Sequence, residues 1–302
     1  MGPGGEPIDL ERTFLSHGVA SLPPMKVDDA GADLEMTLSL TTGKPRTVRV
    51  TRRGKRALLE VTGRAPGEKT ATELLHKTKH VLRFDEDLSE FYALAQDDPE
   101  LEWVGGGAGR MIRSASVFEE VVKTVLTTNC AWSATVRMVT ALVANLGEPS
   151  IGAAKEGWEG RAFPTPAAVA GAGEPFFKEV VRAGYRGPYL IAVARSIVDG
   201  DLDLESLGRA TSEELSDDEL EQILLSLPGV GPYAAAHVMM MLGRYSRLIL
   251  DSWTRPTYAR LMGKKTVADV TIARRFRRYG RYAGLAFWLF LTKGWIAEPD
   301  AS

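Results

Sequence analysis

The sequence predicts an α+β protein, in which an antiparallel β-rich domain precedes a mostly α-helical region of two helical subdomains. Apolar residues alternate with period two across 33–61, as in strands with one buried face. Beyond residue 79 they recur at helical spacing, between Gly and Pro breaks. A Gly- and Pro-rich turn at 227–232 separates two of these helical stretches. We therefore expect domains at 1–78 and 79–302.

The composition is that of an ordinary globular protein and excludes several classes. Hydrophobic residues make up 44% and charged residues 25% of the 302 residues. The single cysteine, Cys130, excludes a disulfide framework and a Cys-ligated iron–sulfur cluster. No apolar run reaches about 18 uncharged residues, so we expect no membrane span. The net charge of −2 means that nucleic-acid binding would depend on local basic patches such as 274–281.

The β-rich domain is expected to be a meander of three strands. Alternating residues at 33–40, 47–51 and 57–61 are separated by turns at 41–44 and 53–55. One face of such a sheet is buried and the other faces water. A loop follows, and helical periodicity begins at Glu73.

The helical region is expected to contain a series of amphipathic helices. Ser116 with Glu119 forms a capping-box pattern at the start of a long helix, and Gly147 ends the next helix. The periodicity predicts helices over 87–95, 116–129, 133–146, 192–198, 218–226, 232–242 and 279–292.

The turn at 227–232 is predicted to form a short hairpin with an anion site. Pro228 and Gly229 stop one helix, and Pro232 suits the first turn of the next. Gly231 is expected to take a backbone conformation that a side chain would resist. The N–H groups of Gly229 and Gly231 would then face outward beside a helix N-terminus, where a DNA phosphate fits.

Asp251 follows the apolar run 248–250 and stands twenty residues after Gly231. Alone, it is better explained by capping of the next helix. Together with the hairpin, it resembles the helix-hairpin-helix (Gly/Pro…Asp) superfamily of DNA glycosylases. Further segments resemble the subgroup of AlkA-type 3-methyladenine and 8-oxoguanine DNA glycosylases, and the likeness covers about residues 80–296. These segments are 116–129, 163–166, 184–190, 279–286 and 292–295.

The resemblance implies an enzyme that hydrolyses the N-glycosidic bond of a damaged base flipped out of double-stranded DNA. Asp251 would stabilise the oxocarbenium-like sugar and orient the attacking water. Bifunctional relatives carry a Lys where this chain has Tyr233, and a phenol cannot form a Schiff base. We therefore expect a monofunctional hydrolase. The resemblance implies no required cofactor, and it allows a Na⁺ or K⁺ ion at the hairpin backbone.

The resemblance also implies which residues contact DNA. Asn129 would fill the gap left by the flipped nucleotide, with Trp132 as a neighbouring wedge. The alternatives are a helix C-cap for Asn129 and a core position for Trp132. Phosphate and backbone contacts are expected from Gly229, Val230, Gly231, Arg255, Arg277 and Arg281. We expect a monomer without membrane contact, in the cytoplasm at the bacterial nucleoid, or in the nucleus of a eukaryote.

The pocket for the flipped base is expected to be formed by Tyr233, His237, Phe287 and Trp288. His237 lies one helical turn beyond Tyr233, so both can face one cleft. The alternative for His237, Phe287 and Trp288 is a core position. Phe287 stands where 8-oxoguanine enzymes have an amide, which favours stacking on a positively charged alkylated purine.

Three alternatives remain to be weighed. One is a glycosylase for oxidised or deaminated bases. Another is a non-catalytic helix-hairpin-helix module that binds damaged DNA, against which Asp251 argues. A nucleotide-phosphate loop at 229–231 is excluded, because no strand precedes it and the Gly and Lys residues of such motifs are missing.

Overall fold

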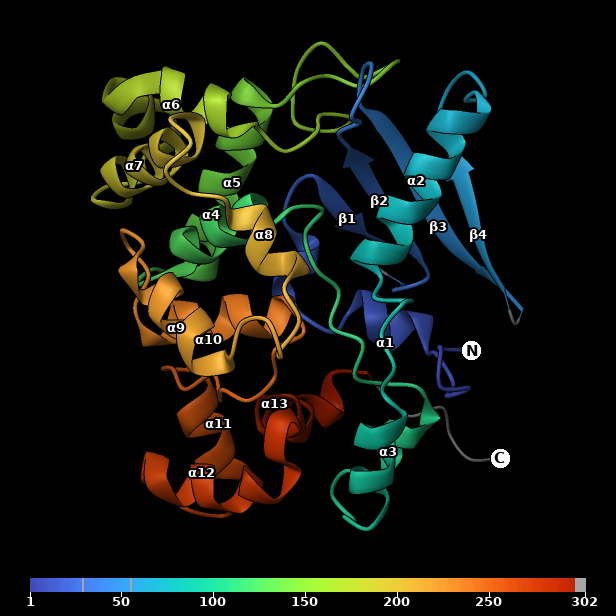
Figure 1. The fold of residues 1–302 in the computed structure, drawn as a ribbon, viewed down its shortest axis with the longest axis vertical. Coiled ribbons are helices and arrows are strands. Elements are labelled where there is room, and N and C mark those ends of the chain that lie inside the picture. The colour runs from blue at the N-terminus through green and yellow to red at the C-terminus, as the bar shows by residue number, and fades with distance from the viewer. Residues whose placement is uncertain (29, 55, 297–302) are drawn as a thin grey trace.

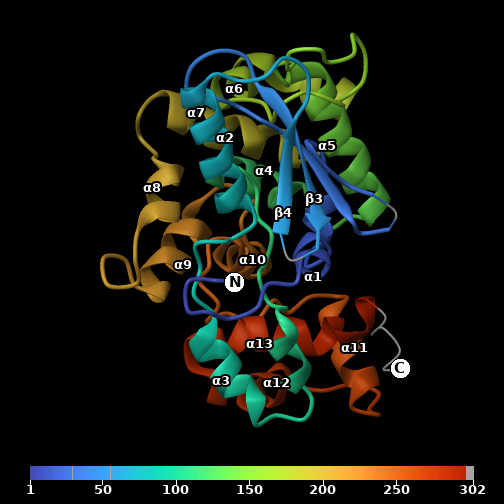
Figure 2. The same ribbon diagram turned by 90° about the vertical axis from the view of Figure 1, so that its right-hand side faces the viewer.

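The computed structural model describes residues 1–28, 30–54 and 56–296. It consists of an antiparallel sheet with a covering helix, followed by two groups of helices (Figures 1 and 2). This arrangement confirms the predicted α+β class. In the described part of the chain, no helix is both long and apolar enough to span a bilayer.

The sheet has the strand order β1-β2-β3-β4, and each strand pairs antiparallel with the next. Its strands are β1 (Met25–Val27), β2 (Asp33–Leu38), β3 (Arg46–Arg53) and β4 (Arg56–Val61). The predicted meander is confirmed from β2 to β4. The sequence did not predict β1, because three residues are too few to show an alternation.

The buried face of the sheet packs against α1 (Leu10–Phe14) and α2 (Glu68–Val81). Leu34 and Met36 of β2 share this core with Leu74 and Val81 of α2. Because α2 begins at Glu68 and continues to Val81, the predicted domain boundary at residue 78 falls within this helix.

The helices form two hydrophobic cores, which confirms the two predicted subdomains. The first core gathers α4 (Val117–Thr127), α5 (Trp132–Leu146), α6 (Pro166–Pro175), α7 (Arg186–Val198), α8 (Leu204–Arg209) and α9 (Asp217–Ser226). The second gathers α3 (Ser89–Gln96), α11 (Thr254–Leu261), α12 (Asp269–Phe276) and α13 (Ala283–Thr292), which lie together at the foot of Figure 1.

Helix α10 (Pro232–Met241) contributes side chains to both cores and therefore joins them. The sequence predicted one last helix over 279–292, but α13 begins only at Ala283. The reason is Gly280, whose φ of 53° and ψ of −122° interrupt the helical backbone.

Buried polar contacts hold the sheet domain against the helices. Arg83 donates from Nε to the carbonyl of Met111 at 2.7 Å and from Nη2 to that of Met240 at 3.3 Å. Arg110 forms a fully buried ion pair with Glu6. Breaking the contacts of Arg83 or of Arg110 would leave a buried charge without a partner. The sheet domain is therefore held in one position against the helices.

Candidate active site

The hairpin between α9 and α10 has the predicted position, but the glycine that must adopt an unusual backbone conformation is Gly229 and not Gly231. Gly229 has φ = 82°, and a Cβ there would lie 2.8 Å from the ring of Tyr189. Gly231 has an ordinary extended backbone with open space around it, so the expectation for Gly231 is corrected. Val230 donates its N–H to the carbonyl of Leu227 at 3.1 Å and buries its side chain.

A cavity of about 910 Å³ opens beside this hairpin. It lies at the C-terminal end of α4 and the N-terminal end of α10, with α13 forming part of its wall. The structure brings together at this cavity most of the residues that the sequence predicted for the site, namely Asn129, Trp132, Gly229, Gly231, Tyr233, His237, Asp251 and Trp288.

Asp251 lies at the cavity wall with its carboxylate held by the backbone. Its Oδ1 accepts hydrogen bonds from the N–H groups of Trp253 at 2.8 Å and Thr254 at 2.6 Å. Asp251 therefore holds two N–H groups at the start of α11 through one oxygen only, although the N-cap residue of this helix is Trp253. Oδ2 has no hydrogen-bond partner among the described residues, which leaves it for a bound molecule.

Tyr233 borders the cavity with a neutral phenol. Its hydroxyl lies 3.3 Å from Oγ1 of Thr127. Burial raises the pKa of Tyr233, so the group stays protonated at neutral pH. The ring of His237 lies 5.9 Å from that of Tyr233, as expected from their spacing of one helical turn.

Three indole rings form an aromatic wall. Trp288 is nearly buried, and its ring centroid lies 5.7 Å from those of both Trp253 and Trp295. The rings of Trp253 and Trp295 are 5.6 Å apart and partly exposed. Sequence reasoning missed Trp253 and Trp295, although the position of Trp253, two residues after Asp251, was a signal for it.

Asn129, in the loop that follows α4, and Trp132, the first residue of α5, both border the cavity. The C-cap of α4 is Thr128, and Asn129 follows it with a left-handed backbone conformation, φ = 47°. Nδ2 of Asn129 donates to the hydroxyl of Tyr185 at 3.1 Å. Trp132 is 46% exposed, so it is not the core tryptophan of the alternative interpretation. Arg186 holds this loop by donating from Nε to the carbonyl of Thr128 at 3.0 Å.

Phe287 does not line the cavity. Its side chain is fully buried, and its ring centroid lies 5.3 Å from that of Phe276 and 6.1 Å from that of Tyr258. It therefore belongs to the second core, and the predicted stacking role is corrected. The aromatic residue of α13 that lines the cavity is its neighbour Trp288.

The predicted arginines also lie outside the cavity lining. Arg255 makes a two-pronged ion pair with Asp269, at 2.8 Å and 2.9 Å, and Arg281 pairs with Glu90. Arg277 is exposed. Contacts from these three side chains to a DNA backbone remain a prediction. The carboxylates of Asp269 and Glu90 partly neutralise Arg255 and Arg281 and would compete with a phosphate for them.

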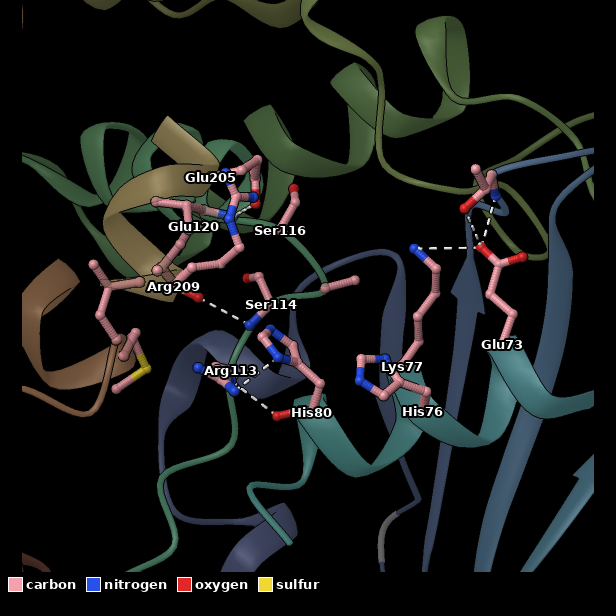
Figure 3. Close-up of a pocket in the computed structure, with 16 residues that line it drawn as sticks. Glu73, His76, Lys77, His80, Arg113, Ser114, Ser116, Glu120, Glu205 and Arg209 are labelled. Carbon is pink, nitrogen blue, oxygen red and sulfur yellow. Dashed lines mark hydrogen bonds and ion pairs between the residues drawn. The ribbon is translucent and has the colours of Figure 1, made fainter. Parts of the chain in front are cut away.

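A second cavity, of about 400 Å³, lies at the opposite ends of α4 and α10 (Figure 3). Its charged groups already have partners within the protein. Glu205 accepts the N–H groups of Val117 at 3.2 Å and Phe118 at 3.1 Å, and Arg113 contacts Nδ1 of His80 at 2.8 Å. This pairing makes it a poor site for an additional anion such as a DNA phosphate.

His80 in this second cavity is expected to weaken the fold in acid. Burial and the adjacent Arg113 guanidinium lower the pKa of His80 to about 3. The unfolded chain binds a proton at about pH 6.5, so stability is lost as the pH falls below that value. We expect a loss of about 2 kcal/mol between pH 8 and pH 5 from this residue.

Urea unfolding at several pH values measures this contribution. In His80→Asn, Oδ1 replaces Nδ1 as the acceptor for Arg113. The free energy of unfolding should therefore fall by about 2 kcal/mol less between pH 8 and pH 5 than in the wild type. The exposed His76, changed to Gln, serves as the control and should follow the wild type. Equal pH dependence in wild type and His80→Asn would contradict the assignment.

Scans of protein-family models and of curated protein sequences found no match. Solved structures do match. The 3-methyladenine DNA-glycosylase from Archaeoglobus fulgidus superposes with a TM-score of 0.74 at 19% identity, over 97% of this chain and 98% of that one. The 8-oxoguanine glycosylase/lyase of Clostridium acetobutylicum in its apo-form gives 0.73 at 22% identity, over 95% and 93% of the two chains.

The Clostridium acetobutylicum enzyme in complex with double-stranded DNA containing cytosine opposite 8-oxoguanine gives a TM-score of 0.71 at 21% identity, over 95% of this chain and 91% of that one. Each likeness extends over nearly the whole of both chains, the N-terminal sheet included. Over nearly all of its length, this chain therefore shares the fold of these DNA glycosylases.

Proposed function

We propose that the protein is a monofunctional DNA glycosylase that excises a damaged base from double-stranded DNA. The observation that carries this proposal is Asp251, held at the wall of the large cavity with no partner for Oδ2 in the part of the chain that the structure describes. A carboxylate in this position has the task of stabilising positive charge on a sugar. A module that only binds DNA has no use for it.

The target nucleotide leaves the base stack and places its base in the cavity. As the bond between C1′ and the base nitrogen breaks, the base takes the bonding electrons and the sugar gains oxocarbenium character. Asp251 stabilises that charge and orients a water molecule, which adds to C1′. A positively charged alkylated purine leaves as a neutral base, and the proton that the water loses passes to the Asp251 carboxylate and from there to solvent.

The hairpin and the loop after α4 hold the duplex in this mechanism. The N–H groups of Gly229 and Gly231 border the cavity and bind a phosphate, directly or with a Na⁺ or K⁺ ion at the same backbone. Asn129 lies exposed at the cavity rim, where it enters the gap left by the nucleotide. No cofactor takes part in these steps.

The preferred lesion is an alkylated purine. The wall formed by Trp253, Trp288 and Trp295 presents electron-rich faces, and such faces attract a base that carries a formal positive charge. Oxidised and deaminated bases are neutral and gain less from this attraction. They are the alternative outcomes of the experiment below.

The strand-cleaving step of lyases is absent from this proposal. Tyr233 occupies the position of the amine nucleophile, and burial raises the pKa of this phenol. A neutral phenol forms no imine with the opened sugar. Borohydride should therefore trap no covalent complex between the protein and lesion DNA.

The test is incubation with labelled duplexes, each carrying one alkylated, oxidised or deaminated base. We expect strand breaks at an alkylated purine after hot alkali, and none before it. Breaks without alkali, or a borohydride-trapped complex, would contradict the monofunctional mode. Binding to lesion duplexes without excision from any of them would favour the damage-binding module.

A further inference from the structure

Two histidines from distant parts of the chain meet in the large cavity, and the proposed stacking of the base leaves them without a role. His17 belongs to the sheet domain, while His237 lies on α10. Their ring centroids are 4.4 Å apart, with the planes at 74°. The ring of His17 also lies 4.9 Å from that of Trp288. Both imidazoles are thus placed beside the aromatic wall.

His17 is held in one orientation and one tautomer. It caps the 3₁₀ helix Gly18–Ser21, and its Nδ1 accepts the N–H of Val19 at 3.2 Å. Burial and the neighbouring His237 keep the pKa of His17 well below its usual value, so the ring is neutral. With Nδ1 as the acceptor, the single ring proton lies on Nε2.

The segment that carries His17 is also fixed to the helices. Trp288 donates from Nε1 to the carbonyl of Ser16 at 2.9 Å, and Ser16 Oγ accepts the N–H of Ile112 at 2.9 Å. The Nε2–H donor of His17 is therefore preorganised rather than drawn in by a ligand.

His237 has buried polar atoms without a partner. It is 3% exposed, and neither ring nitrogen has a hydrogen-bond partner among the described residues. The charged groups that act on it are Glu120 and Asp251, with His17 and Tyr233 as ring neighbours. Unpaired buried nitrogens cost stability, and an apolar side chain here would avoid this cost.

We propose that His17 and His237 form a hydrogen-bonding pair that selects the extruded base by its edge. His17 donates from Nε2 to an unprotonated ring nitrogen or carbonyl oxygen, and His237 completes the pattern with its own donor and acceptor. The substrate class is then a purine that keeps an acceptor on the edge facing α10. This inference rests on the proposed function only in taking the ligand to be a flipped-out base.

Two variants separate this role from a structural one. In His17→Asn, Oδ1 still accepts the N–H of Val19, because Asn is a favourable capping residue, but the Nε2–H donor is gone. His237→Phe keeps a ring and removes the two unpaired nitrogens, so its melting temperature should equal or exceed that of the wild type. His76→Gln, in the second cavity, is the control.

The direct test is ¹⁵N NMR of the imidazoles in the whole protein, with free adenine, 3-methyladenine, 3-deazaadenine and 7-deazaadenine as probes. We expect the free protein to show His17 protonated at Nε2 only, and adenine or 3-methyladenine to shift the His17 and His237 signals but not that of His76. One deaza base should bind at least about 10-fold more weakly than adenine, and His17→Asn should erase that difference.

The pair is refuted if no base shifts its signals, or if His17→Asn discriminates between adenine and the deaza bases as the wild type does. A lower melting temperature of His237→Phe would assign that ring to the fold instead. Excision assays report separately on the proposed function. If free bases bind at the two histidines but no lesion is excised, the proposed glycosylase function is wrong. If His17→Asn and His237→Phe both excise lesions with the selectivity of the wild type, the proposed role of the two histidines is wrong.

Discussion

Asp251→Asn is expected to slow base excision by at least about 100-fold while duplex binding stays close to that of the wild type. The substitution removes the negative charge that the proposed mechanism places beside the sugar. It leaves the shape of the site unchanged, because an Asn Oδ1 accepts the same two N–H groups, those of Trp253 and Thr254. The loss therefore appears in single-turnover excision rates and not in the dissociation constant for the lesion duplex.

Asp269→Asn is the matched control for this experiment. Asp269 is another carboxylate at the start of a helix, but it is exposed and lies outside the cavity, paired with Arg255. Its loss should leave excision rates within about threefold of the wild type, as is usual for an exposed ion pair. Near-normal excision by Asp251→Asn, or equal losses in the two variants, would contradict the assigned role.

Gly284→Ala is expected to lower the free energy of unfolding by about 2–4 kcal/mol. Gly284 lies where α13 meets the chain segment that leads to Asp251, and its N–H donates to the carbonyl of Tyr245 at 2.6 Å. A Cβ would lie 2.1 Å from the carbonyl oxygen of Arg247 and 2.8 Å from that of Tyr245. Backbone atoms cannot rotate out of the way, so the segment has to move.

That movement has a second consequence, because the displaced segment ends at Asp251. Excision should fall together with stability, even at temperatures where the variant is fully folded. Gly171→Ala is the control, since a Cβ on this α6 residue meets nothing within 4 Å and alanine favours a helix. If Gly284→Ala unfolds at the same urea concentration as the wild type, the close packing of Gly284 against the carbonyl oxygens of Arg247 and Tyr245 would be contradicted.

The sequence was informative wherever the determinants of structure are local. The alternation in β2, β3 and β4 and the Pro–Gly punctuation between α9 and α10 are set by neighbouring residues, and both predictions are confirmed. Which glycine of the hairpin needs a left-handed backbone is less local. It depends on how Tyr189 of α7 packs against Gly229, and a sequence does not show that contact.

The cavity lining depends on long-range packing and was only partly predictable. His17 arrives from the sheet domain and Trp295 from the short 3₁₀ helix Lys293–Trp295 after α13, so neither is placed by residues near it in sequence. The prediction that Phe287 lines the pocket together with Trp288 was wrong for Phe287, for another reason. Every residue of α13 is buried, so the helix has no polar face to show which side turns toward the cavity.

A crystal structure of Asp251→Asn bound to a duplex with an excisable lesion would show where the damaged nucleotide binds. We expect an extruded nucleotide whose base stacks in the cavity of about 910 Å³, with C1′ beside residue 251 and a phosphate on the N–H groups of Gly229 and Gly231. A duplex bound across the second cavity of Figure 3, or one with every base still stacked and the hairpin unoccupied, would contradict this expectation.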